Sequence, residues 1–190
     1  MLVAMSGYKT AGKDEAANVL IEEYGFKKLA LADPVKALAY AINPMIGRDE
    51  CGCHPLRLQD HIMYVGLDEA KKHPEVRRLY QAIGTEGGRT LFGENFWVDQ
   101  LKKNVPGLFD EDTRYVLTDA RFKNEGDFVQ QNGGRLFWID RPGLESDGHA
   151  SESGELRDQA NGIIRNESTI EELREDVRFA MYYNGIHKPA

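Results

Sequence analysis

SGYKTAGKDE, residues 6–15, directly follows the short apolar run MLVAM. It contains the pattern Gly7-x-x-x-x-Gly12-Lys13, in which glycines let the backbone curve around phosphate oxygens and the lysine adds a positive charge. The apolar run predicts a buried strand, and GKDEAANVLIEEYG predicts a helix that ends at Gly25. This order directs backbone N–H groups and a helix N-terminus at an anion. We therefore expect a phosphate-binding loop, and the alternative is a strand–turn–helix junction with a surface lysine.

Asp14 stands where this pattern usually has Ser or Thr, whose hydroxyl binds Mg²⁺. A carboxylate is also a good ligand for a hard cation, but it adds negative charge beside a triphosphate. Asp14 either reaches Mg²⁺, directly or through water, or forms hydrogen bonds within the loop. It is otherwise an acidic residue of a first helical turn, which the helix dipole favours.

Strand and helix patterns alternate along the rest of the sequence. The runs that predict strands are KKLALAD (27–33), YVLT (115–118), RLFWID (135–140) and NGIIRNE (161–167). Helices are predicted over 33–42, 73–93, 94–105, 123–134 and 168–183. The glycine pair 87–88 predicts a break within the second of these helices. Alternation of this kind predicts one domain, an α/β fold with a parallel sheet covered by helices on both faces.

Three further local features are expected. Residues 43–66, rich in Gly, Pro, Cys and His, indicate a loop or insertion, and the polar segment 141–160 indicates a mobile one. Ser168 is expected to cap the last helix, because Glu171 stands at the capping-box spacing.

The composition limits the classes of partner. The chain has 190 residues, 24 basic and 31 acidic, with a net charge of −7, which disfavours sequence-independent binding of a nucleic acid polymer. No segment has the pattern of a signal peptide or approaches the ~20 apolar residues of a membrane span. We expect a soluble, cytoplasmic protein without a membrane partner.

The two cysteines, Cys51 and Cys53, lie in DECGCH. One intervening residue disfavours a disulfide, and with His54 and His61 nearby the alternative is a metal cluster. Four ligands would then come from one short loop without paired CxxC spacing, so a plain loop is the preferred interpretation.

Asp119 ends the apolar run YVLT, where a phosphate-loop protein places a second Mg²⁺-associated carboxylate. Arg121 follows two residues later, and strand ends of this kind point to where α/β proteins bind ligands. The alternative is an Asp that caps the next helix.

Other basic residues suggest a second anion site. Lys36 lies in a first helical turn, where the dipole disfavours a cation unless an anion is present. Arg89 follows a Gly-Gly pair, and Arg141 leaves a strand for the polar segment. Each alone is more often an ordinary surface charge. Trp97 either stacks on a base or fills the core.

Several segments together resemble a family, the deoxynucleoside monophosphate kinases of bacteriophages within the P-loop nucleoside monophosphate kinase superfamily. They are GKDEAA, LADPVKAL, YQAIGTEGGRTLFGENFW, VLTDARFKNEGDFV, RLFWIDRPG, HASE and NGIIRNESTIEEL, in this order over nearly the whole chain. Such proteins typically carry Asp at the position of Asp14, followed by Thr, whereas this chain has Glu15.

The resemblance implies a P-loop three-layer α/β/α sandwich with a monophosphate-binding insertion at about 34–105 and a mobile lid at about 141–160. It implies phosphoryl transfer from MgATP to a deoxynucleoside 5′-monophosphate, in the host cytoplasm if the protein is phage-encoded. Residues implied to bind ATP are Gly7, Lys9, Thr10, Ala11, Gly12, Lys13, Asp14 and Glu15, with Mg²⁺ near Asp14 and Asp119. Residues implied to bind the acceptor are Asp33, Lys36, Arg89, Trp97, Glu125, Ser151 and Glu152, with His149 beside the last two. Lys13, Asp119, Arg121 and Arg141 are implied to be catalytic, with Arg157 as a second lid arginine.

Other functions stay open from the sequence. One is a small-acceptor kinase of the same fold that acts on dephospho-CoA, adenylate or phosphomevalonate. Another is a nucleotide-dependent switch that hydrolyses ATP slowly. The accepted bases and the oligomeric state, a homodimer included, are not fixed by these patterns.

Overall fold

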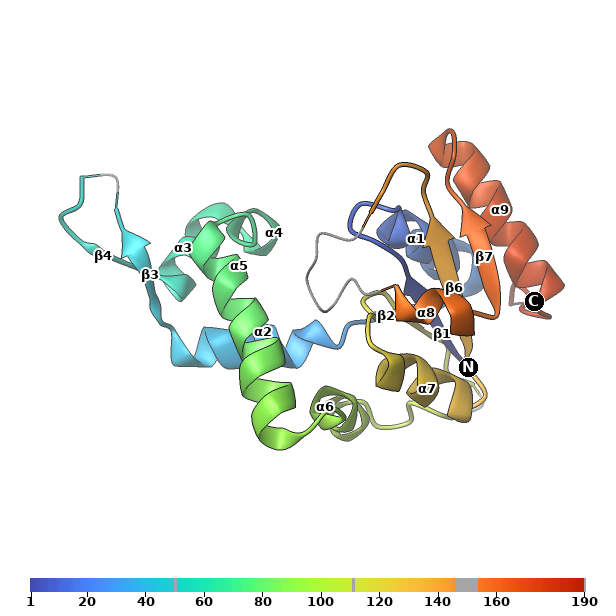
Figure 1. Ribbon diagram of the computed structural model, residues 1–190, viewed down its shortest axis with the longest axis horizontal. Helices are drawn as coiled ribbons and strands as arrows, with labels where there is room; N and C mark the ends of the chain where they lie inside the picture. Colours follow the sequence, from blue (N-terminus) through green and yellow to red (C-terminus); the bar gives the residue numbers. More distant parts are fainter. Residues whose placement is uncertain (50, 111, 146–153, 190) are drawn as a thin grey trace. The chain divides into compact units, whose positions relative to one another are not determined.

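A computed structural model describes residues 1–49, 51–110, 112–145 and 154–189 (Figure 1). The chain forms two compact units. The first combines Met1–Ala30 with Lys102–Ala190, and the second is Leu31–Leu101. Among the described residues, no helix has the length and apolar character needed to cross a membrane.

The first unit is built on a five-stranded sheet with the order β2-β5-β1-β6-β7. Its strands are β1 (Leu2–Ser6), β2 (Lys27–Leu29), β5 (Tyr115–Leu117), β6 (Arg135–Asp140) and β7 (Gly162–Arg165). All four neighbouring pairs are parallel. The apolar run of β1 lies at the centre of the sheet, and all five of its residues are buried. The predicted parallel sheet is therefore confirmed.

Helices cover both faces of this sheet. On one face lie α1 (Lys13–Tyr24) and α9 (Ile170–Tyr183), which pack on each other and share an apolar core with alternate sheet residues such as Val3, Met5 and Phe137. On the other lie α7 (Lys123–Gln131) and α8 (Glu155–Gln159), which pack on β6. Because alternate residues of a strand face opposite sides, β1 and β6 are apolar nearly throughout. The predicted three-layer arrangement is confirmed.

The second unit is mostly helical. Its elements are α2 (Ala32–Ile42), β3 (Met45–Arg48), β4 (Pro55–Arg57), α3 (Leu58–Val65), α4 (Leu67–Ala70), α5 (Pro74–Gln81), the π-helix η1 (Ala82–Thr90) and most of α6 (Phe96–Asn104). A small core of Ala39, Ile46, Leu58 and Val76 holds α2, the hairpin, α3 and α5 together.

The structure decides one local expectation and corrects two others. Of the two alternatives for residues 43–66, a loop or an insertion, the structure favours the insertion, because this segment contains the antiparallel hairpin β3–β4 and helix α3. The glycine pair 87–88 does not break its helix, since both residues lie inside η1. A Cβ at Gly88 would lie 2.4 Å from the ring of Trp97, so this glycine serves close packing. Helix α9 is capped by Thr169 rather than Ser168, because the Thr169 hydroxyl accepts from the N–H of Glu172 at 3.2 Å.

Candidate active site

The loop between β1 and α1 has the curvature that its glycines predict. Gly7 has φ of +143°, and a Cβ there would lie 2.5 Å from the carbonyl oxygen of Ile139 on β6. Gly12 has φ of +103° and forms the left-handed N-cap of α1. Both conformations favour glycine. The sequence therefore bends the backbone tightly over the carboxyl edge of the sheet, immediately before a helix N-terminus.

Lys13, the first residue of α1, folds back over this loop. Its ammonium group donates to the carbonyl oxygens of Gly7 at 2.8 Å and Tyr8 at 2.6 Å. The lysine charge is thus fixed against the start of the loop. An anion held by the loop N–H groups would lie where this charge stabilises it.

Residues at the ends of two other strands hold the loop from the side. Asn166, which follows β7, donates from its amide nitrogen to the carbonyl oxygen of Ala11 at 2.9 Å. Arg141, which follows β6, donates to the carbonyl oxygen of Thr10 at 3.3 Å. Arg141 was predicted from the sequence, and the structure places its guanidinium beside the loop. Asn166 was not predicted, because an Asn after a short strand carries no local signal.

Asp119 and Arg121 lie in the segment that follows β5. The Ser6 hydroxyl donates to the carbonyl oxygen of Ala120 at 2.8 Å, which joins this segment to the end of β1. Because β1 and β5 are parallel neighbours, Asp119 and the start of the loop share one edge of the sheet.

Glu125 supports the same segment. The residue is 3% exposed, and its carboxylate accepts from the backbone N–H groups of Arg121 at 2.6 Å and Phe122 at 3.1 Å. The resemblance implied that Glu125 binds the acceptor, and these contacts indicate that it orients the turn carrying Asp119 and Arg121.

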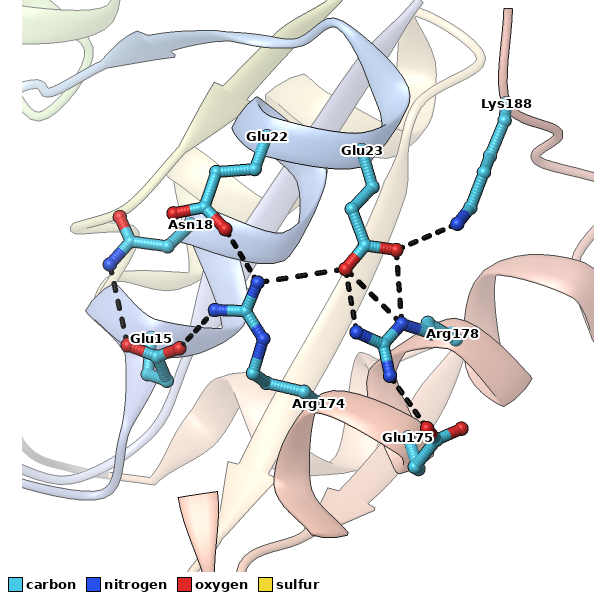
Figure 2. Close-up of polar contacts among 8 residues, drawn as sticks. All are labelled: Glu15, Asn18, Glu22, Glu23, Arg174, Glu175, Arg178 and Lys188. Atoms are coloured by element: carbon cyan, nitrogen blue, oxygen red, sulfur yellow. Dashed lines mark hydrogen bonds and ion pairs between the residues drawn. The ribbon is translucent and has the colours of Figure 1, made fainter. Parts of the chain in front are cut away.

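The two acids after Lys13 both have cationic partners. The Asp14 carboxylate, 81% exposed, lies 2.9 Å from the ammonium of Lys28 on β2. The Glu15 carboxylate lies 2.5 Å from the guanidinium of Arg174 on α9 (Figure 2). Glu15 is therefore turned toward the C-terminal helix, and its backbone N–H stays in the first turn of α1. Neither partner was predicted, since both are distant in sequence.

In the second unit, the acceptor-binding candidates make local contacts. Lys36 lies 2.6 Å from the carboxylate of Asp33, one turn earlier on α2. Arg89 donates to the carbonyl oxygen of Glu94 at 3.1 Å. Trp97 is 5% exposed and donates from its indole N–H to the carbonyl oxygen of Gly84 at 2.7 Å. Of the two alternatives for its ring, stacking on a base or filling the core, the structure favours the core. Ser151, Glu152 and His149 lie outside the described residues.

The lid candidate Arg157 lies on α8 and points back to the sheet. Its guanidinium is 3.3 Å from the carboxylate of Asp140, the last residue of β6. Arg141 and Arg157 therefore both lie near the carboxyl end of β6, and the segment 146–153 between them lies outside the described residues.

The strand order, with a glycine loop and a lysine-started helix after the central strand, defines a P-loop α/β protein. Residues 58–177 match the model of a family described as deoxynucleotide monophosphate kinase. The chain belongs to this family.

Relatives support this membership along most of the chain. One from Acanthamoeba polyphaga mimivirus, named as a deoxynucleotide monophosphate kinase, is 30% identical over 91% of this chain and 92% of its own. The deoxynucleotide monophosphate kinase of Enterobacteria phage T4 is 25% identical over 90% of this chain and 95% of its own. The shikimate kinase of Aquifex aeolicus aligns over 98% of this chain and 99% of its own, with 11% identity and a TM-score of 0.49.

Proposed function

We propose that this protein transfers the γ-phosphoryl group of MgATP to a deoxynucleoside 5′-monophosphate, with release of ADP and the diphosphate. The observation that carries the proposal is the fixed position of Lys13 over the loop, with Arg141 reaching the same loop, in a chain of the deoxynucleotide monophosphate kinase family. The reaction needs no strong base, because the attacking phosphate oxygen is already anionic at neutral pH. Catalysis is then alignment and neutralisation of charge.

The ATP phosphates would bind to the N–H groups of residues 7–15. Lys13 would exchange its two carbonyl contacts for phosphate oxygens, and Arg141 is close enough to approach the transferring group. Arg121, on the turn that Glu125 fixes, would lie at the same edge. A dry, closed site would strengthen each of these interactions.

The acidic residues fit a magnesium ion. Mg²⁺ prefers carboxylate oxygens and keeps several of its waters, and Asp14 and Asp119 offer such oxygens at the edge that holds the loop. Asp14 is largely exposed, so it can leave Lys28 for the metal or a metal-bound water. When bound, Mg²⁺ would neutralise charge on the β- and γ-phosphates.

The monophosphate would bind to the second unit. Lys36 and Arg89 supply the positive charge there, and Asp33 orients Lys36 through their ion pair. Trp97 would act by packing, since its buried ring lies against Gly88, next to Arg89. Residues 141–160 would form the lid, with Arg141 and Arg157 at its two ends, and Ser151 and Glu152 would contact the acceptor.

The test is an acceptor panel. The chain is incubated with MgATP and each of the four common deoxynucleoside monophosphates, AMP or dephospho-CoA, and ADP release is followed. We expect turnover with at least one deoxynucleoside monophosphate and near-complete loss in Lys13→Ala. Lys123→Ala, which removes a lysine paired with Asp127 on α7, is the matched control and should keep full activity.

Two results would reject the proposal. Turnover of only AMP or dephospho-CoA would identify a different small-acceptor kinase. ATP hydrolysis that no acceptor changes would identify a nucleotide-dependent switch.

A further inference from the structure

The tip of the hairpin β3–β4 gathers carboxylate, thiol and imidazole side chains to which the proposed phosphoryl transfer gives no role. The tip is the sequence DECGCH, residues 49–54. Sequence spacing alone favoured a plain loop, because Cys51, Cys53, His54 and His61 lack paired CxxC spacing. The structure adds Asp49 to the set and leaves His61 out. One donor atom from each of Asp49, Cys51 and His54 lies within 4.8 Å of the other two.

The turn itself brings these groups together. The N–H of Gly52 donates to the carbonyl oxygen of Asp49 at 2.9 Å, and the N–H of Asp49 donates to the carbonyl oxygen of His54 at 3.1 Å. Gly52 has φ of +72°, which a side chain would strain. Asp49 is therefore hydrogen-bonded through its backbone to both Gly52 and His54, which brings the described residues of the tip close together.

The side chains converge on Asp49. One carboxylate oxygen accepts from the Cys51 thiol at 3.2 Å and from the N–H of Cys53 at 2.8 Å. The other lies 3.0 Å from Nδ1 of His54. The Cys53 thiol lies 3.5 Å from the carbonyl oxygen of Cys51 and is outside this group of three donors.

We propose that this hairpin tip binds one Zn²⁺ through Asp49, Cys51 and His54, with Cys53 as the fourth ligand. Thiolate, imidazole and carboxylate together form a donor set that zinc accepts in tetrahedral sites. With metal–ligand bonds of about 2.0–2.3 Å, donor atoms around one zinc lie about 3.5 Å apart. The donor atoms of Asp49, Cys51 and His54, already within 4.8 Å of one another, lie close to this spacing, and the Cys53 thiol would turn toward them to complete the set.

The charges of the tip also fit a dication. Two thiolates and one carboxylate carry three negative charges, so the site with Zn²⁺ bound has a net charge of −1. Arg48 donates to the carbonyl oxygen of Gly52 at 3.1 Å, which places a positive charge beside the turn. Zinc binding releases the thiol protons and joins the two strands of a short hairpin. It should therefore stabilise the second unit, by an amount that grows with the logarithm of the free zinc concentration above Kd.

The experiment uses the full chain, reduced and freed of metal, without nucleotide. Zn²⁺ binding is measured by competition with a chromophoric chelator, and Co²⁺ serves as a spectroscopic probe because thiolate ligation gives a charge-transfer band. We expect one Zn²⁺ per chain and protection of both thiols from alkylation. Asp49→Asn, Cys51→Ser, Cys53→Ser and His54→Asn should each weaken binding at least about tenfold, since even outer-shell changes cost that much.

His61→Asn is the matched control. His61 meets His73 edge to face, with ring centroids 5.2 Å apart. The substitution therefore removes a nearby imidazole that is not at the tip. It should keep the affinity and the charge-transfer band. Absence of stoichiometric Zn²⁺ binding, or binding that Cys51→Ser and His54→Asn leave unchanged, would overturn the proposal. Kinase activity is not the readout, so the result is independent of the proposed function.

Discussion

Arg174 of helix α9 holds the carboxylate of Glu15, two residues after the loop lysine, at 2.5 Å. The same guanidinium lies 2.5 Å from Glu22 and 3.5 Å from Glu23 on α1 (Figure 2). Arg178 is also paired with Glu23, at 2.7 Å. The helix that begins at the phosphate loop is thus fastened along its length to the C-terminal helix.

Glu15→Gln should weaken the fold more than it weakens ATP binding. Glu15 and Arg174 are mostly shielded, with 28% and 21% of their side chains exposed, so we expect the free energy of unfolding to fall by about 1–2 kcal/mol. The KM for ATP should change less than about twofold, because the contact we assign to Glu15 is made by its backbone.

Denaturant unfolding and initial rates check the Glu15 variant. Glu22→Gln, which touches the same arginine through a carboxylate 56% exposed, is the control and should cost less than about 1 kcal/mol. A large rise in KM with unchanged stability would instead assign the Glu15 carboxylate to the nucleotide.

Glu23 should make stability depend on pH in the acid range. The Arg178 guanidinium, and then the Lys188 ammonium, lower the pKa of Glu23 from 4.5 to about 2 through hydrogen bonds. Because the folded pKa lies below the unfolded one, this stabilisation is complete above about pH 4.5 and is lost as pH falls toward 2.

Urea unfolding of Glu23→Gln at a series of pH values tests this. The variant should be less stable than the wild type at neutral pH and should lose less stability between pH 4.5 and 2. Glu171→Gln removes one carboxylate without touching Arg178 or Lys188 and controls for net charge. Parallel curves for wild type and Glu23→Gln would contradict the prediction.

Gly7→Ala should destabilise the protein and abolish phosphoryl transfer. The new Cβ would lie 2.5 Å from the carbonyl oxygen of Ile139, and the residue would keep φ of +143°. Backbone strain and overpacking each cost about 1–3 kcal/mol. Gly133→Ala is the control, because Gly133 has φ of +73° and no atom within 4 Å of an added Cβ. It introduces backbone strain without overpacking, so it should lower the free energy of unfolding less than Gly7→Ala does. Thermal unfolding and initial rates measure both variants, and equal losses would mean that the close approach to β6 does not matter.

Lys36→Ala and Arg89→Ala should affect the acceptor rather than ATP. Each removes a positive charge that we assign to the monophosphate, so the acceptor KM should rise about tenfold or more, or kcat should fall, with the KM for ATP nearly unchanged. Lys71→Ala, which removes the partner of Asp68 on α4, is the control in the same unit and should behave as wild type. An effect confined to ATP would show that these residues serve the donor site.

The sequence predicted the sheet and the loop because both depend on local patterns. β1 and β6 are apolar runs, and Gly7, Gly12 and Lys13 stand at fixed spacings beside them. It could not predict the groups that hold the loop, since Asn166, Arg174 and Lys28 meet their partners only through the fold. The helix break predicted at the glycine pair 87–88 is wrong for a related reason. A glycine that makes room for a tryptophan cannot be told from one that breaks a helix without the tertiary contact between Gly88 and Trp97.

The contact between Asn166 and the carbonyl oxygen of Ala11 joins residues 155 positions apart. During synthesis the glycine loop emerges from the ribosome well before the strand and helix that support it. The loop is therefore made long before the contacts that hold it can form. A nascent chain truncated before β7 would carry the whole glycine motif without the structure that shapes it.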